Sequence, residues 1–174
     1  IAVSGGRPVG GGVNNKNEPR DGSVSTVGKH AIFYTGSYMG YMEATNYEDL
    51  PGVKGNSRAW AQGGVAMSLG NQNWVSVVNK AVDVNSDHEG LSAIVVNLDT
   101  NKVYLIATAK NVNYVEFRSA IQSYLGLKDS AANDPAWKGL FLDGGASTQL
   151  RCAEAEITTG RLLCQVIVLK SKAN

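Results

Sequence analysis

The sequence predicts an α+β fold: a single domain with a mixed, mostly antiparallel β-sheet and one or two packed helices. Most apolar runs have the length of a strand, one pair of runs has a hairpin signature, and one segment has helical periodicity with signals at both ends. The chain has 174 residues, 43% of them hydrophobic, which suffices for one domain with a sizeable core. Because no repeat or linker divides the chain, residues 1–174 are expected to form one domain.

The first strands are predicted from apolar runs bounded by turn residues. Residues 91–98 and 102–108 form the clearest hairpin, with Asp-Thr-Asn at 99–101 as its turn. Residues 31–35 and 38–44 form a second pair, joined by a Gly-Ser turn.

Three further segments complete the predicted sheet. Residues 59–69 have the composition of a buried strand, and the Gly63-Gly64 pair within them predicts a bulge or a close backbone approach. Residues 74–78 and 139–142 are predicted to be short strands.

One helix is predicted from Tyr114 to Leu125. Asn113 and Glu116 resemble a capping box, with Asn in place of the usual Ser or Thr. Gly126 is a natural stop at the other end. The apolar residues of this segment fall on one helical face, so the helix is expected to pack on the sheet.

The composition argues against several classes of partner. Lys and Arg number 16 against 15 Asp and Glu, and a net charge of +1 gives no footprint for a nucleic-acid polymer or an anionic membrane. The longest apolar runs, such as 93–96 and 166–169, are too short to span a bilayer. No metal-ligand spacing and no Walker-type or dinucleotide motif is present, so we expect neither a metal nor a cofactor. The chain begins with Ile1 rather than methionine, as a processed or truncated chain does.

The two cysteines flank residues 156–161, which are predicted to form a hairpin turn with Gly160 at a position that needs a positive φ. Cys152 and Cys164 are equidistant from residue 158, so they would face each other across this hairpin at disulfide distance. A disulfide favours an extracytoplasmic or secreted location. The alternative is two reduced cysteines on one side of the sheet.

The segment most informative about function is LFLDGGASTQL at 140–150. A short apolar run ends at Asp143, and the two glycines that follow permit a sharp turn and a close approach of backbone to a ligand. Ser147, Thr148 and Gln149 bring hydrogen-bonding side chains to the same space. This combination suits an oxygen-rich ligand such as a sugar or a phosphate ester. The alternative is an ordinary Asp-Gly turn of a β-rich protein.

The order of elements around this turn is also informative. A hairpin at 92–106, a helix at 114–125 and the Asp-Gly-Gly turn follow one another, and 61–67 supplies a small-residue segment upstream. The chain resembles the phosphodiester glycosidase family over residues 58–150 in this order of elements. Residues 140–148 are also similar to the family's Leu-Asp-Gly-Gly-Gly-Ser-Thr signature. The resemblance implies a hydrolase that cleaves a sugar-1-phosphodiester at the anomeric centre.

The resemblance also implies roles for the residues of the turn. Asp143 is the candidate carboxylate for assisting proton transfer or stabilising an oxocarbenium-like centre. The amides of Gly144 and Gly145, with the hydroxyls of Ser147 and Thr148, are candidate donors to sugar or phosphate oxygens, in the manner of a backbone nest. The alternative for Asp143 is a cap that satisfies its own turn.

The sequence departs from the family pattern at two places. The family opens the first hairpin strand with Arg-Thr, whereas residues 87–92 contain no arginine. The family's N-terminal Asn-Gly-Gly-Phe-Phe motif has its nearest counterpart at 10–14, which keeps the glycines and lacks the aromatic residues. These departures leave open rearranged catalysis, binding without turnover, or action on a different phosphodiester.

Other candidate residues lie outside the turn. His88 and Glu89 stand where the family's arginine is expected, and His88 can donate to a phosphate or exchange protons near neutral pH, unless this stretch is a solvated loop. Gln62, with Gly63 beside it, is a candidate for binding a sugar hydroxyl or an ordinary strand residue. Arg58 is either a replacement cation or a surface arginine.

Three functional hypotheses therefore stand. The first is a hydrolase of phosphodiester α-glycosides with a carbohydrate or sugar-phosphate ligand. The second is a module of the same fold that binds a glycan or a phosphorylated ligand without turnover. The third is a structural domain of a phage tail or cell-surface assembly, which the 20 glycines permit.

Overall fold

The structure is a computed structural model that describes residues 12–13, 19–20, 30–44, 49–78, 82–159 and 167, with backbone alone at 12–13 and 19–20. The strands are β1 (Gly12–Val13), β2 (Pro19–Arg20), β3 (His30–Tyr34), β4 (Met39–Glu43), β5 (Trp60–Ala66), β6 (Leu91–Asn97), β7 (Lys102–Thr108), β8 (Trp137–Phe141), β9 (Leu150–Arg151) and β10 (Glu156–Ile157). The helices are α1 (Trp74–Val78), α2 (Tyr114–Leu125) and the short 3-10 helix η2 (Gly145–Ser147).

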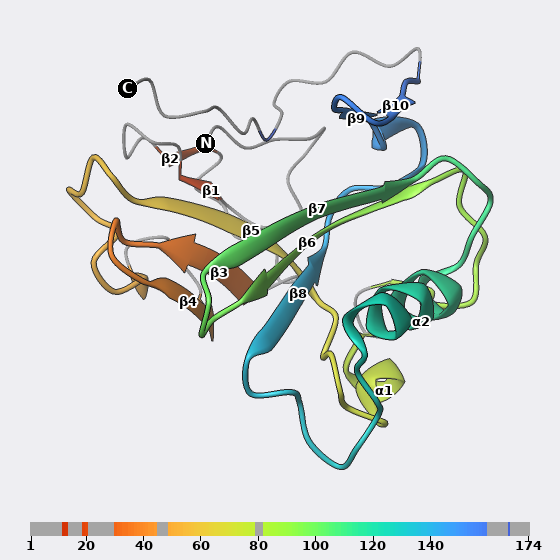
Figure 1. The fold of residues 1–174 in the computed structure, drawn as a ribbon, viewed down its shortest axis with the longest axis horizontal. Coiled ribbons are helices and arrows are strands. Elements are labelled where there is room, and N and C mark those ends of the chain that lie inside the picture. The colour runs from red at the N-terminus through yellow and green to blue at the C-terminus, as the bar shows by residue number, and fades with distance from the viewer. Residues whose placement is uncertain are drawn as a thin grey trace.

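Eight of the strands form one sheet in which every strand pair is antiparallel (Figure 1). The order along the main path is β2-β1-β5-β8-β6-β7, while β3 pairs with β5 and β4 with β3. β9 and β10 form a separate two-stranded sheet. With two α-helices beside this sheet, the described residues form the α+β fold that the sequence predicts.

The main sheet consists of two halves, the first made of β1–β5 and the second of β6–β8, which are joined at a narrow junction between β5 and β8. Only Val65 with Phe141 and Ala66 with Leu140 pair between β5 and β8, whereas β3 pairs with β5 over five positions and β6 with β7 over seven. One face of both halves shares a buried cluster, to which β3 contributes Ile32 and β6 contributes Ile94. The junction therefore brings the end of β8 close to the centre of the molecule.

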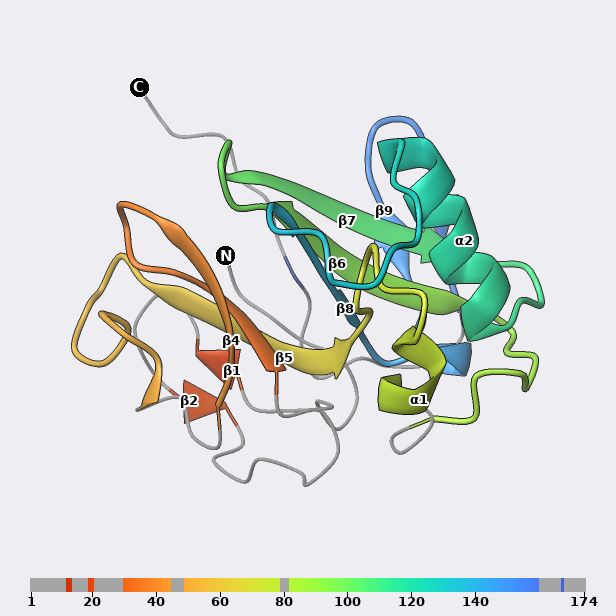
Figure 2. The same cartoon turned by 90° about the horizontal axis from the view of Figure 1, so that it is seen from below.

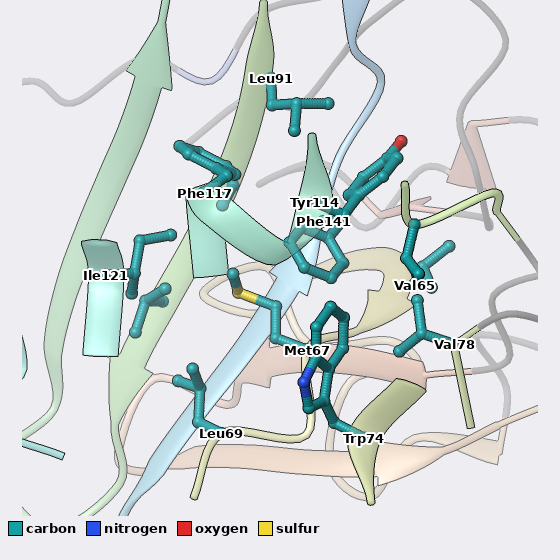
Figure 3. Packing of buried hydrophobic residues seen from close by; sticks show 13 residues of the cluster. Val65, Met67, Leu69, Trp74, Val78, Leu91, Tyr114, Phe117, Ile121 and Phe141 are labelled. Carbon is teal, nitrogen blue, oxygen red and sulfur yellow. The ribbon is translucent and has the colours of Figure 1, made fainter. Parts of the chain in front are cut away.

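The helices cover the opposite face of the second half, where the largest buried cluster lies (Figures 1 and 2). Phe141 from β8 lies in this cluster among the rings of Trp74, Tyr114 and Phe117 (Figure 3). Trp74 and Trp60 are both buried, and Trp137 is half-buried. No helix of the described part of the chain has the length and apolar content needed to cross a membrane.

The strongest local predictions are confirmed. The 91–108 hairpin forms as β6 and β7, and α2 has the predicted bounds. The Asn113 side chain accepts the Glu116 amide at 2.9 Å, and Gly126 ends the helix in the left-handed conformation with φ +71°. Both helix ends are therefore determined by local sequence.

The glycine pair of β5 produces a close approach and not a bulge. β5 pairs with β3 without interruption from Trp60 to Gly64. A Cβ atom at Gly64 would lie 2.6 Å from the Phe141 carbonyl oxygen, which is closer than real Cβ atoms come. Gly64 therefore lets β8 cross β5 at the junction.

Two predictions about local structure are wrong. Residues 74–78 form helix α1 and not a strand, because Trp74 and Val78, four residues apart, are the buried pair while Val77 is exposed. Residues 156–157, predicted to open a hairpin turn, form strand β10, which pairs with β9 through a turn at 152–155 where the Cys152 amide donates to the Ala155 carbonyl at 3.0 Å; the predicted turn beyond residue 159 lies outside the described residues.

Several predictions fall on parts of the chain that the structure does not describe. Cys152 is exposed, while Cys164 and Gly160 lie outside the described residues, and the disulfide between the cysteines stays a prediction. The same holds for most of the glycine segment at 10–14.

Candidate functional site

The Asp-Gly-Gly turn follows β8 directly and is held by the start of β6. The Leu142 amide donates to the Ser92 carbonyl at 2.8 Å, and the Ser92 hydroxyl donates to the Asp143 carbonyl at 2.6 Å. The Gly145 amide donates to the Gly90 carbonyl at 2.7 Å. Three hydrogen bonds thus fix the backbone around Asp143, whose side chain is half-buried.

The glycines of this region allow three segments to approach closely. A Cβ atom at Gly144 would lie 2.9 Å from Leu91 Cδ2, and one at Gly90 would lie 2.5 Å from the Thr108 carbonyl and 3.1 Å from Thr148 Cβ. Gly145 has a φ of +58°, which L residues rarely adopt. The turn is therefore packed tightly against the start of β6, and Gly90 at that start is packed against both the end of β7 and Thr148.

The two glycine amides that the sequence nominates as ligand donors are already engaged. The Gly144 amide donates to Asp143 Oδ1 at 3.1 Å, and the Gly145 amide donates to Gly90. Asp143 therefore does cap its own turn, and an anion would have to displace existing hydrogen bonds to use either amide.

Asp143 follows the end of β8, and its charge acts on Tyr114 at the start of α2. Side chains alternate along extended chain, so Asp143 shares a face with Phe141, two residues earlier. The Phe141 ring lies edge-on to the Tyr114 ring at 4.8 Å, and the Tyr114 ring lies 5.0 Å from that of His88. Burial raises the pKa of Tyr114, and the negative charge of Asp143 raises it further. Asp143, Tyr114 and His88 thus come together from three distant parts of the chain.

His88 is held in place by Val112, immediately before α2. Each residue's amide donates to the other's carbonyl, at 3.0 and 3.1 Å. This pairing leaves His88 half-buried, so it is not part of a fully solvated loop. Glu89, the next residue, is exposed.

Three buried polar atoms near this turn have no hydrogen-bond partner among the described residues. They are His88 Nε2, Ser147 Oγ and Thr148 Oγ1. A buried polar atom without a partner costs on the order of 1–3 kcal/mol, so such atoms call for an explanation such as a ligand or an ordered water. We refer to Asp143, Tyr114, His88, Ser147 and Thr148 as the Asp143 cluster.

Gln62 lies on the far side of the sheet from Asp143, while Gly63 alternates with it, shares the face of Val65 and has no side chain with which to reach the cluster. Gln62 pairs with Ile32 and shares its face with Trp60, inside the cluster between the two halves of the sheet. Its Nε2 donates to the Gly63 carbonyl at 2.5 Å, and its Oε1 is the fourth buried polar atom without a described partner. The structure therefore does not join Gln62 or Gly63 to the Asp143 cluster.

Arg58 is also separate from the cluster. It is exposed before the start of β5 and packs beside Gly36 in the β3–β4 turn, whereas Asp143 follows the junction at Val65 and Phe141. Figure 1 shows the start of β5 and the blue segment after β8 on different sides of the molecule. Gln149, the last residue nominated from the turn, donates from Nε2 to the Thr159 hydroxyl at 3.1 Å.

An apolar hollow of about 480 Å³ lies beside the cluster, between β7 and α2. Tyr104, Ile106, Ile121 and Tyr124 line most of it, and Val112, the pairing partner of His88, lies at its margin. None of the five residues of the Asp143 cluster lines this hollow.

Comparison of the chain with protein-family models, with curated proteins and with solved structures finds no match.

Sequence reasoning missed Tyr114, Ser92 and Gly90 as parts of the site. Tyr114 has the spacing of a core residue in the helix. Its position as the first helical residue, where a ring reaches the edge of the core, was the sequence feature that could have identified it. Ser92 and Gly90 acquire their roles only through pairing with the turn more than 50 residues later, which local pattern does not reveal.

Proposed function

We propose that the chain is a hydrolase of phosphodiester α-glycosides in which Asp143 acts at the anomeric carbon. The observation that carries the proposal is a half-buried carboxylate in a region with three buried polar atoms, from His88, Ser147 and Thr148, that have no partner among the described residues. Polar groups are kept unsatisfied at a cost mainly where function uses them.

The chemistry needs little beyond this set. Water attacks the anomeric carbon, the bond between that carbon and the phosphate oxygen breaks, and a free sugar and a phosphate monoester leave. Because a phosphate monoester is a good leaving group, the main demand is stabilisation of positive charge on the sugar ring, which a carboxylate at Asp143 supplies.

The test is hydrolysis of an α-N-acetylglucosaminyl p-nitrophenyl phosphodiester and a panel of related sugar phosphodiesters. The release of free sugar is followed by mass spectrometry in wild type, Asp143→Asn and Asp99→Asn. Asp99 is an exposed acid in the β6–β7 turn and provides a matched control. We expect Asp143→Asn to lose about 100-fold or more in turnover and Asp99→Asn to match wild type.

Two results would contradict the proposal. One is undiminished turnover in Asp143→Asn, which would remove Asp143 from the reaction. The other is the absence of product from every member of the panel with wild-type protein.

A second candidate is a binding module without turnover, and the engaged glycine amides favour it. A phosphate would find neither the Gly144 nor the Gly145 amide free, and Arg58 is remote from the turn. For this function we expect a ligand of the same panel to raise the melting temperature while no product forms over a long incubation.

A further inference from the structure

Tyr114 combines a buried, packed ring with a hydroxyl at the margin of the core. Its ring is fixed edge-on between Phe141 and His88, at 4.8 and 5.0 Å, and the capping box of Asn113 fixes the backbone next to it. Figure 3 shows its hydroxyl directed away from the packed rings, at the margin of the core. The rigid ring thus presents a phenol group at a defined place.

Asp143 lies on the same side as this phenol. The pairing of the Leu142 amide with Ser92 continues the extended chain past Phe141, and Leu142 packs on the opposite face, so alternation places Asp143 on the face where Phe141 meets Tyr114. The charge of Asp143 and burial both raise the pKa of Tyr114. The phenol therefore keeps its proton and can donate a hydrogen bond, while the carboxylate can only accept.

We infer that Tyr114 and Asp143 together bind one hydroxyl group of a sugar ring. A hydroxyl is both acceptor and donor, so it can accept from the phenol and donate to the carboxylate at the same time. An anionic phosphate oxygen would be repelled by Asp143 and has no proton to donate to it. This part of the cluster therefore takes the carbohydrate portion of a ligand and not its phosphate.

The inference rests on the proposed function only in taking a sugar as the ligand, and its test does not measure hydrolysis. Wild type, Tyr114→Phe and Tyr124→Phe are titrated with N-acetylglucosamine, glucose, galactose and mannose, and with inorganic phosphate, by protein NMR. Tyr124 lies at the other end of α2 and is 76% exposed, so it is a matched control. We expect at least one sugar to bind wild type, and Tyr114→Phe to weaken it about three- to tenfold. Phosphate binding and the Tyr124→Phe variant should be unchanged.

A deoxy-sugar series makes the test specific to one hydroxyl. Singly deoxygenated forms of the sugar that binds are titrated into wild type and Tyr114→Phe. One of them should bind more weakly than the parent sugar in wild type, and the difference should be smaller in Tyr114→Phe, where only the bond to Asp143 is left to lose. If Tyr114→Phe does not fold, the loss at a single position in wild type and in Tyr124→Phe still tests the inference.

The outcomes separate the inference from the proposed function. Equal sugar affinity in wild type and Tyr114→Phe, or no sugar binding by wild type, overturns the inference. Coupling between Tyr114 and one sugar hydroxyl supports it even where no phosphodiester is hydrolysed. Asp143-dependent hydrolysis without that coupling keeps the proposed function and refutes the inference.

Discussion

Replacing Gly90 by alanine should damage the turn more than its small size suggests. The added methyl group would lie 2.5 Å from the Thr108 carbonyl oxygen and 3.1 Å from Thr148 Cβ. The first neighbour is backbone within β7 and cannot rotate away. Relief therefore requires residue 90 to move relative to both β7 and the turn.

The cost follows from two contributions. Overpacking against backbone costs about 1–3 kcal/mol, and movement of residue 90 weakens the hydrogen bond from the Gly145 amide, worth about 0.5–1.5 kcal/mol. We therefore expect Gly90→Ala to lower the free energy of unfolding by roughly 2–4 kcal/mol.

The assay is urea unfolding followed by circular dichroism, with Gly55→Ala as the control. Gly55 has a φ of +72° and open space around its Cβ position, so alanine there meets only the backbone penalty of about 1–2 kcal/mol. Gly90→Ala should be the more destabilised of the two, and it should also lose ligand binding or turnover that Gly55→Ala keeps. A Gly90→Ala protein within about 0.5 kcal/mol of wild type would refute the packing described for this turn.

Two further predictions concern charged groups in the fold. Arg118 is 2% exposed, donates to three backbone carbonyls and pairs with Asp129 at 2.9 Å, whereas the Asp129 side chain is 40% exposed. Arg118→Met should therefore lower the free energy of unfolding in urea by about 3–5 kcal/mol, and Asp129→Asn by about 1 kcal/mol. Similar losses in the two variants would contradict this account. Burial lowers the pKa of His30, opposed by Glu43, so the unfolded state takes up the proton first and stability falls as pH drops from about 7 through 6.5 and below. His30→Asn should reduce that fall in the urea midpoint between pH 7 and 5, and an unchanged pH dependence would exclude His30 as its source.

Elements with local signals were predictable, and a short apolar run was not. α2 carries its own start and stop in Asn113 and Gly126, so its bounds followed from sequence. Residues 74–78 gave no such signal, because five residues rich in valine fit a strand or one helical turn equally well. Tertiary packing decided, with Trp74 and Val78 both directed into the core.

The site was predictable only in its continuous part. The turn after residue 142 has the expected sharp backbone, since Gly145 has a φ of +58°, while the close approach of its backbone to a ligand stays a prediction. The partnership of Asp143 with Tyr114 and His88 depends on the pairing of His88 with Val112 and on the packing of α2, which are set by the whole fold. Gln62 was nominated from its segment, but its side chain faces the other side of the sheet, because side chains alternate along β5.

The capping role of Asp143 and its proposed catalytic role are compatible, and one pair of variants separates them. A carboxylate has two oxygens, so the bond from the Gly144 amide to Oδ1 at 3.1 Å leaves acceptor capacity for a ligand and also holds the side chain in one orientation. Asparagine keeps an oxygen for that cap and removes the charge, whereas alanine removes both. We therefore expect Asp143→Asn to unfold within about 0.5 kcal/mol of wild type and Asp143→Ala to lose about 1 kcal/mol, while both lose turnover or sugar binding. If Asp143→Asn kept full function and Asp143→Ala lost only stability, Asp143 would be a cap alone and the function of this surface would have to be sought elsewhere.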